Sequence, residues 1–105
     1  MAIERTTSSR NTLRVAALGD IHVSKGSQGQ FQPLFSKINS SADVLVLCGD
    51  FTDYGLPDEA RVLVRELNAS VKIPVIAVLG NHDYEGGKED EIRQLLVDGG
   101  VTVLD

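Results

Sequence analysis

Three short segments of this 105-residue chain carry the side chains best suited to chemistry. They read Asp20-Ile21-His22, Gly49-Asp50-Phe51-Thr52-Asp53 and Gly80-Asn81-His82-Asp83, and each directly follows an apolar run. Both histidines of the chain lie in these segments. Aspartate, asparagine and histidine supply the oxygen and nitrogen ligands that hold divalent cations in proteins. The segments therefore predict a metal centre, and hydrolysis of a phosphate ester held against the cations is the chemistry such a centre performs.

Four residues of these segments are predicted to bind metal. Asp20 and His22 are two positions apart, so at the extended end of a strand both side chains would point to one side, toward a single ion. The two carboxylate oxygens of Asp50 can bridge a pair of cations, and Asn81 can bind the second cation through its neutral amide oxygen. Taken alone, Asp20 could be a capping residue beside a structural His22, Asp50 could cap a turn, and Asn81 could be a left-handed turn residue.

His82 and Asp83 are predicted to be catalytic. Asp83 follows His82 directly, and a neighbouring carboxylate can orient an imidazole or raise its proton affinity. Such a histidine could protonate the leaving oxygen or stabilise the transferring phosphoryl group, while a metal-activated hydroxide attacks phosphorus. A solvated loop histidine is the alternative. Asp53 is assigned a turn or supporting role.

Strands and helices must bring these segments together. Residues 13–18, 44–48 and 75–79 are apolar, rich in β-branched side chains and followed by glycine, which predicts three strands. Between and after them, apolar residues recur at helical spacing, and Gly99-Gly100 precedes a last strand at 101–104. The helical positions are Phe31, Leu34, Phe35 and Ile38, then Ala60, Leu63, Val64 and Leu67, then Ile92, Leu95 and Leu96.

This order, βαβαβαβ, predicts an α/β fold with a mainly parallel sheet. Parallel strands joined by crossover helices place all their strand-to-helix loops at one end of the sheet. Asp20, Asp50 and Asn81 follow one another at intervals of about 30 positions, the length of one βαβ unit. The three segments are therefore expected to meet at that end.

The motifs D-x-H, G-D-x-x-D and G-N-H-D, in this order, resemble those of the calcineurin-like metallophosphoesterase family over roughly residues 13–105. The resemblance implies a sandwich of two mixed sheets with helices outside, of which this chain supplies the first sheet. It implies that Asp20 and His22 bind one cation, Asp50 bridges both and Asn81 binds the other. It also implies that His82 acts at the scissile phosphate with Asp83 as its orienting partner.

The family completes its site with later histidines, two of them in a G-H-x-H segment, and these 105 residues contain none of them. The resemblance therefore predicts that residues 13–105 are the amino-terminal part of a truncated domain, with two divalent cations (Mn, Fe or Zn) and an incomplete second site. One apolar sheet face would lack its partner, which predicts self-association or pairing with the missing carboxy-terminal half. Low or no activity is expected of this chain alone.

Composition limits the remaining classes. A chain that is 42% hydrophobic and 24% charged is typical of one small globular domain, and residues 1–12, which lack apolar periodicity, are predicted to form a flexible tail. A net charge of −5 disfavours nucleic-acid binding but allows a phosphorylated small molecule or nucleotide as substrate. No apolar stretch has the length of a membrane span. Cys48, the only cysteine, is expected to be a buried thiol in a cytoplasmic protein.

Two other functions are weighed against a phosphoesterase. A non-enzymatic metal-binding or partner module could retain the half-fold, although retention of every motif residue argues against it. A receiver-like signalling domain would also place aspartates at the ends of parallel strands and hold magnesium there. Imidazole ligands such as His22 and His82 suit manganese, iron or zinc better than magnesium, so a titration comparing these metals discriminates.

Overall fold

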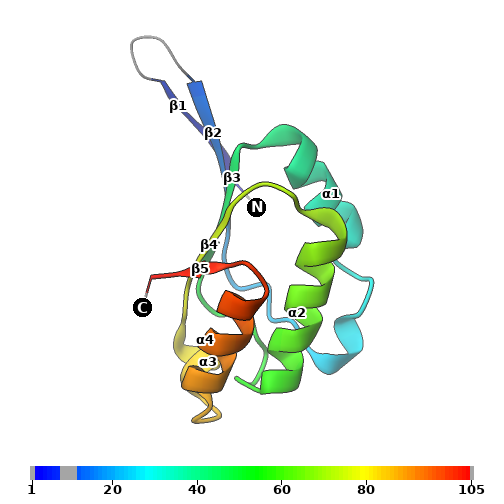
Figure 1. Ribbon diagram of the computed structural model, residues 1–105, viewed down its shortest axis with the longest axis vertical. Coiled ribbons are helices and arrows are strands. Elements are labelled where there is room, and N and C mark those ends of the chain that lie inside the picture. Colours follow the sequence, from blue (N-terminus) through cyan, green and yellow to red (C-terminus); the bar gives the residue numbers. More distant parts are fainter. Residues whose placement is uncertain (1, 8–11, 105) are drawn as a thin grey trace.

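A computed structural model of the chain describes residues 2–7 and 12–104, and it contains one five-stranded sheet with helices on one side (Figure 1). The strands are β1 (Ala2–Thr7), β2 (Thr12–Leu18), β3 (Val44–Cys48), β4 (Val75–Val78) and β5 (Thr102–Val103). The helices are α1 (Gln32–Ser41), α2 (Pro57–Ser70), α3 (Asn81–Tyr84) and α4 (Glu89–Asp98), with a 3-10 turn η1 (Lys25–Ser27) before α1.

The strands lie side by side in the order of the sequence, β1-β2-β3-β4-β5. Strands β2 to β5 are parallel, and β1 runs antiparallel to β2. The predicted α/β fold and mainly parallel sheet are therefore confirmed. Right-handed crossovers that always advance in one direction place every helix on the same face of the sheet, which explains the one-sided arrangement in Figure 1.

The core lies between this face of the sheet and helices α1, α2 and α4. Alternate strand residues point into it, such as Ala16, Leu45 and Ala77, which are fully buried. The helices contribute the residues that their periodicity predicts: Phe35, Ile38, Ala60, Leu63, Leu67, Ile92 and Leu96 are buried, and Phe31, Leu34, Val64 and Leu95 are partly buried against them. In the described part of the chain, no helix has the length and apolarity needed to cross a membrane.

The other face of the sheet carries apolar side chains that no helix covers. Neighbouring strands align Ala17, Val46 and Ile76 in one row across this face, and all three are only partly buried. Cys48 and Val78, the paired last residues of β3 and β4, are also exposed. The prediction of a buried Cys48 thiol is therefore wrong, because Cys48 points to the uncovered face rather than to the helices.

The amino-terminal segment differs from its prediction. Residues 1–12 were expected to form a flexible tail, but Ala2–Thr7 form β1 and pair with β2 from Ala2 opposite Ala17 to Thr7 opposite Thr12. Without this partner, the outer edge of β2 would leave a row of backbone hydrogen-bonding groups unpaired. Because β1 is held by backbone pairing with a neighbouring strand, its own sequence needs no apolar periodicity and gives no sign of a strand. Residues 1 and 8–11 lie outside the described part of the chain.

Candidate metal centre

The loops that follow β2 and β3 run together beyond the regular sheet. His22 N–H donates to the Asp50 carbonyl at 3.1 Å, and Val23 N–H donates to the Phe51 carbonyl at 2.8 Å. Asp53 N–H then donates back to the Val23 carbonyl at 2.9 Å. These backbone hydrogen bonds continue the pairing of two parallel strands, so the first two sequence motifs are fixed against each other.

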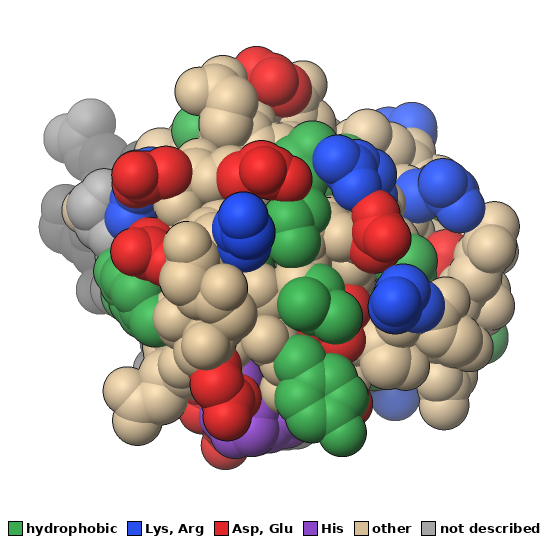
Figure 2. Space-filling model, turned by 90° about the horizontal axis from the view of Figure 1, so that it is seen from below, with side chains coloured by type: hydrophobic (Ala, Val, Ile, Leu, Met, Phe, Trp, Pro, Cys, Tyr) green, Lys and Arg blue, Asp and Glu red, His purple; other side chains and the backbone are tan. Residues whose placement is uncertain are grey.

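Three of the four predicted metal ligands come together at this point. One ligand atom from each of Asp20, His22 and Asp50 lies within 4.8 Å of the other two. Asp20 is exposed, whereas His22 and Asp50 are half-buried. Viewed from the end of the sheet where the loops lie, histidine emerges among acidic side chains (Figure 2). Oxygen and imidazole ligands at this spacing suit a divalent cation.

The same three residues have an unusual backbone. Asp20, His22 and Asp50 have φ angles of 55°, 48° and 49°, and they are the non-glycine residues with positive φ among those described. The expectation that Asp20 and His22 point to one side of an extended strand is thus wrong, although the structure does bring them together. Left-handed backbone costs free energy for residues with a Cβ atom, and such strain concentrates at functional sites.

This strain can be measured at Asp20 with two substitutions. Asp20→Ala and Asp20→Gly both remove the carboxylate, so both should weaken manganese binding in a calorimetric titration. Only glycine accepts the φ of 55° without cost, so Asp20→Gly should be more stable to urea than Asp20→Ala by about 1 kcal/mol. Equal stability of the two variants would show that the backbone is not strained at this position.

Two glycines bring the third loop against the second. A Cβ atom on Gly80 would overlap the backbone nitrogen of Asp50, and one on Gly49 would lie 3.1 Å from the Gly80 Cα. This close approach allows the His82 N–H to donate to Asp50 Oδ1 at 2.9 Å. The hydrogen bond lowers the pKa of Asp50, because it favours the ionised carboxylate. Asp50 is therefore held as an anion beside His82.

We expect Gly80→Ala to separate these loops. The added methyl group meets the backbone nitrogen of Asp50, which cannot rotate away, and the Asp50 carboxylate, so the variant should lose roughly 1–3 kcal/mol of stability and bind cations more weakly. Thermal unfolding and manganese titration measure both effects. Gly26→Ala is the matched control, because the nearest atom to its Cβ would be Ser24 Oγ at 3.9 Å. Identical behaviour of the two variants would contradict the prediction.

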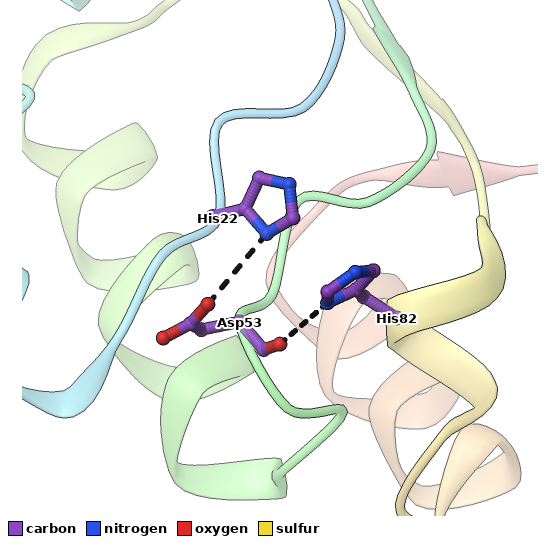
Figure 3. Close-up of side chains that lie close together, drawn as sticks. All are labelled: His22, Asp53 and His82. Atoms are coloured by element: carbon purple, nitrogen blue, oxygen red, sulfur yellow. Dashed lines mark hydrogen bonds and ion pairs between the residues drawn. The ribbon is translucent and has the colours of Figure 1, made fainter.

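His82 lies beside His22, with the ring centroids 4.5 Å apart and the rings edge to face. Its Nδ1 is 2.7 Å from the backbone carbonyl oxygen of Asp53, the contact drawn in Figure 3. This carbonyl, together with the negative charge of Glu85, raises the pKa of His82. A raised pKa favours the protonated imidazole, which is the form that can donate a proton to a leaving oxygen.

Asp83 occupies a different place from the one predicted. Its carboxylate is fully buried and accepts hydrogen bonds from Thr52 N–H, Thr52 Oγ1 and Gly80 N–H. His82 and Asp83 are consecutive residues of helix α3, so their side chains diverge and cannot face each other. The orienting contact to His82 comes from Asp53 instead. Asp83 is thus a positioning residue that joins the second and third motifs.

Sequence reasoning missed the contribution of Thr52, whereas it assigned Asp53 a turn or supporting role. Thr52 is fully buried, and nothing in its local sequence pattern marks it as the partner of a carboxylate. The contacts of Asp53, the second aspartate of the G-D-x-x-D motif, fit its supporting role. Its Oδ1 lies 3.6 Å from His22 Nδ1, in addition to the carbonyl contact with His82 (Figure 3).

Asn81, the fourth predicted ligand, begins helix α3 and is exposed. Together with His82, Tyr84 and Glu85 it lines a hollow of about 350 Å³. The amide of Asn81 therefore faces solvent next to the half-buried histidine, and its role as a metal ligand stays a prediction. A ligand bound beside Asn81 and His82 would therefore occupy this hollow.

Comparison with known proteins identifies the family of the chain. A search of curated proteins found no match to the chain. The model of the calcineurin-like phosphoesterase family matches residues 13–102, which include all three motifs, strands β3 and β4 and all of β2 except its first residue. The chain therefore belongs to the calcineurin-like phosphoesterase family.

Proposed function

We propose that this chain supplies one wall of a metal-dependent phosphoesterase site that hydrolyses a phosphomonoester or phosphodiester. The observation that carries the proposal is the convergence of Asp20, His22 and Asp50, with ligand atoms within 4.8 Å and a strained backbone at each residue. Two carboxylates and an imidazole suit manganese, iron or zinc. Membership of a phosphoesterase family supports the same reaction class.

In this proposal each residue has a defined task. Asp20 and His22 would hold the first cation, Asp50 would serve both cations, and Asn81 would contribute an amide oxygen to the second. The cations, when bound, lower the pKa of a water molecule and offset the charge of the phosphate. His82, whose pKa is raised by the Asp53 carbonyl, donates a proton toward the leaving oxygen. The substrate is a phosphorylated small molecule or a nucleotide.

Hydrolysis and anion binding test this function separately. With manganese present, the chain should bind orthovanadate, a phosphate analogue, and Asp50→Asn should abolish that binding. Turnover of a generic aryl phosphodiester should be low, because the family histidines of the second cation site are not among these residues. Vanadate binding that needs no metal would contradict the proposed function. Fast manganese-dependent turnover would instead contradict only the expectation of low activity.

The uncovered sheet face favours an association as part of the proposal. Ala17, Val46 and Ile76 form an apolar row there, and Val78 beside them is 39% exposed. Such a face is expected to be covered by a second copy or by a polypeptide carrying the carboxy-terminal half of the site. Sedimentation velocity over a range of concentrations tests self-association.

The proposal also places the protein in the cytoplasm, where a lone cysteine such as Cys48 stays reduced.

A further inference from the structure

A second group of metal-binding side chains lies next to the first. His22, Asp53 and His82 each offer one ligand atom within 4.8 Å of the other two, and all three are half-buried. Each comes from a different one of the three loops, and Figure 3 shows the two imidazoles next to each other, with His22 facing the carboxylate of Asp53 and His82 facing its carbonyl. This group shares His22 with the group formed by Asp20 and Asp50, but it uses no other residue of that group.

The spacing of the second group is close to that of a bound metal. His22 Nδ1 and Asp53 Oδ1 are 3.6 Å apart. Ligand atoms around a four-coordinate zinc ion are separated by about 3.3 Å, because metal–ligand distances are about 2.0–2.2 Å. The imidazoles are edge to face at 4.5 Å between centroids, so they converge without stacking. Side-chain rotations that shorten the other separations, which are within 4.8 Å, would bring all three ligands onto one ion.

The ring of His82 is also held by a backbone carbonyl, as the rings of many metal-binding histidines are. One of its nitrogens, Nδ1, lies 2.7 Å from the Asp53 carbonyl and can donate its proton there. A backbone carbonyl in this role fixes the ring and leaves the second nitrogen as the electron-pair donor. Asp53 therefore serves the group twice, with its carboxylate as a ligand and its carbonyl as the support for His82.

We propose that His22, Asp53 and His82 form a separate site for a single zinc-type cation. Two imidazoles and one carboxylate suit zinc, cobalt or iron(II), whereas the group of Asp20, His22 and Asp50 has two carboxylates and suits manganese better. Because both groups need His22, one cation excludes the other. A zinc ion here would also occupy His82 and so inhibit hydrolysis, a consequence that rests on the proposed function, whereas the binding site itself does not.

Metal titrations of the whole chain test this site without any measurement of activity. Zinc affinity is measured by calorimetry, and cobalt binding by the visible absorption of the bound ion. We expect His82→Gln and Asp53→Asn each to weaken zinc and cobalt binding at least tenfold, and Asp20→Asn to change it less than threefold. Asp53→Asn is a clean variant, because it removes the carboxylate and keeps the carbonyl that supports His82.

Manganese provides the matched comparison. Asp20→Asn should weaken manganese binding at least tenfold, while His82→Gln should leave it within threefold, and added zinc should displace manganese one for one. If Asp20→Asn weakens both metals and neither His82→Gln nor Asp53→Asn weakens zinc binding, the separate site does not exist. Manganese-dependent vanadate binding would still be observed in that case, so failure of the zinc site is distinct from failure of the phosphoesterase function.

Discussion

Asp83→Asn is expected to lower the free energy of unfolding by roughly 2–4 kcal/mol. The Asp83 carboxylate is fully buried and accepts three hydrogen bonds, two from Thr52 and one from Gly80 N–H. An asparagine keeps the shape of the side chain but replaces one acceptor oxygen with an NH2 group. That group would face a buried donor of Thr52 or Gly80. Since a chain of this length has a total stability of about 5–15 kcal/mol, urea unfolding followed by circular dichroism should detect a large shift.

The control for this prediction is Asp98→Asn. Asp98 is exposed at the end of α4 and accepts a hydrogen bond from Gln94, so its substitution should change stability by less than about 0.5 kcal/mol. Thr52→Val, alone and combined with Asp83→Asn, isolates the coupling between the two buried partners. If Asp83→Asn unfolds at the same urea concentration as the unchanged chain, Asp83 does not hold the second and third motifs together.

His22→Ala should have the largest effect on metal binding. His22 belongs to both groups of ligands, so its removal leaves only two candidate ligands in each. Loss of a residue that merely supports a ligand costs about 10–100-fold in affinity, so loss of the shared ligand should cost roughly 100-fold or more for manganese and zinc alike. The rise in melting temperature that saturating metal gives the unchanged chain should disappear with it.

Ser36→Ala, on the exposed side of α1, is the control for this loss and should bind both metals normally. The left-handed backbone at His22 persists in His22→Ala, so stability should be compared with His22→Gly, which accepts a φ of 48°. Tight binding of either metal by His22→Ala would show that His22 is not shared between the two groups.

The strands and helices that have a local pattern of apolar residues were predictable from the sequence. Strands β2, β3 and β4 coincide with apolar runs rich in β-branched residues, and helix α2 buries Ala60, Leu63 and Leu67 as their spacing predicts. Strand β1 was missed because its existence depends on pairing with β2 rather than on its own residues. The exposure of Cys48 was missed for a similar reason, because strand order decides which sheet face the helices cover.

The candidate site was predictable in its members more than in its contacts. The motifs identified Asp20, His22 and Asp50, and the structure brings their ligand atoms together. The path of the backbone was not predictable, because a left-handed residue or a short helix reverses the direction in which side chains point. For this reason the partner of His82 is Asp53, distant in sequence, and not the adjacent Asp83.

The sequential order of the strands also bears on how the protein is made. Because β2 pairs with β3 and β3 with β4, each strand docks on the one synthesised just before it. Partners such as Val15 and Val44 belong to neighbouring βα units, so the sheet can grow from its amino-terminal side while the ribosome still extends the chain. Asp20, His22 and Asp50 are in place once β3 has docked. The backbone that carries this group of candidate ligands is therefore paired by strands that precede α4 and β5 in the chain.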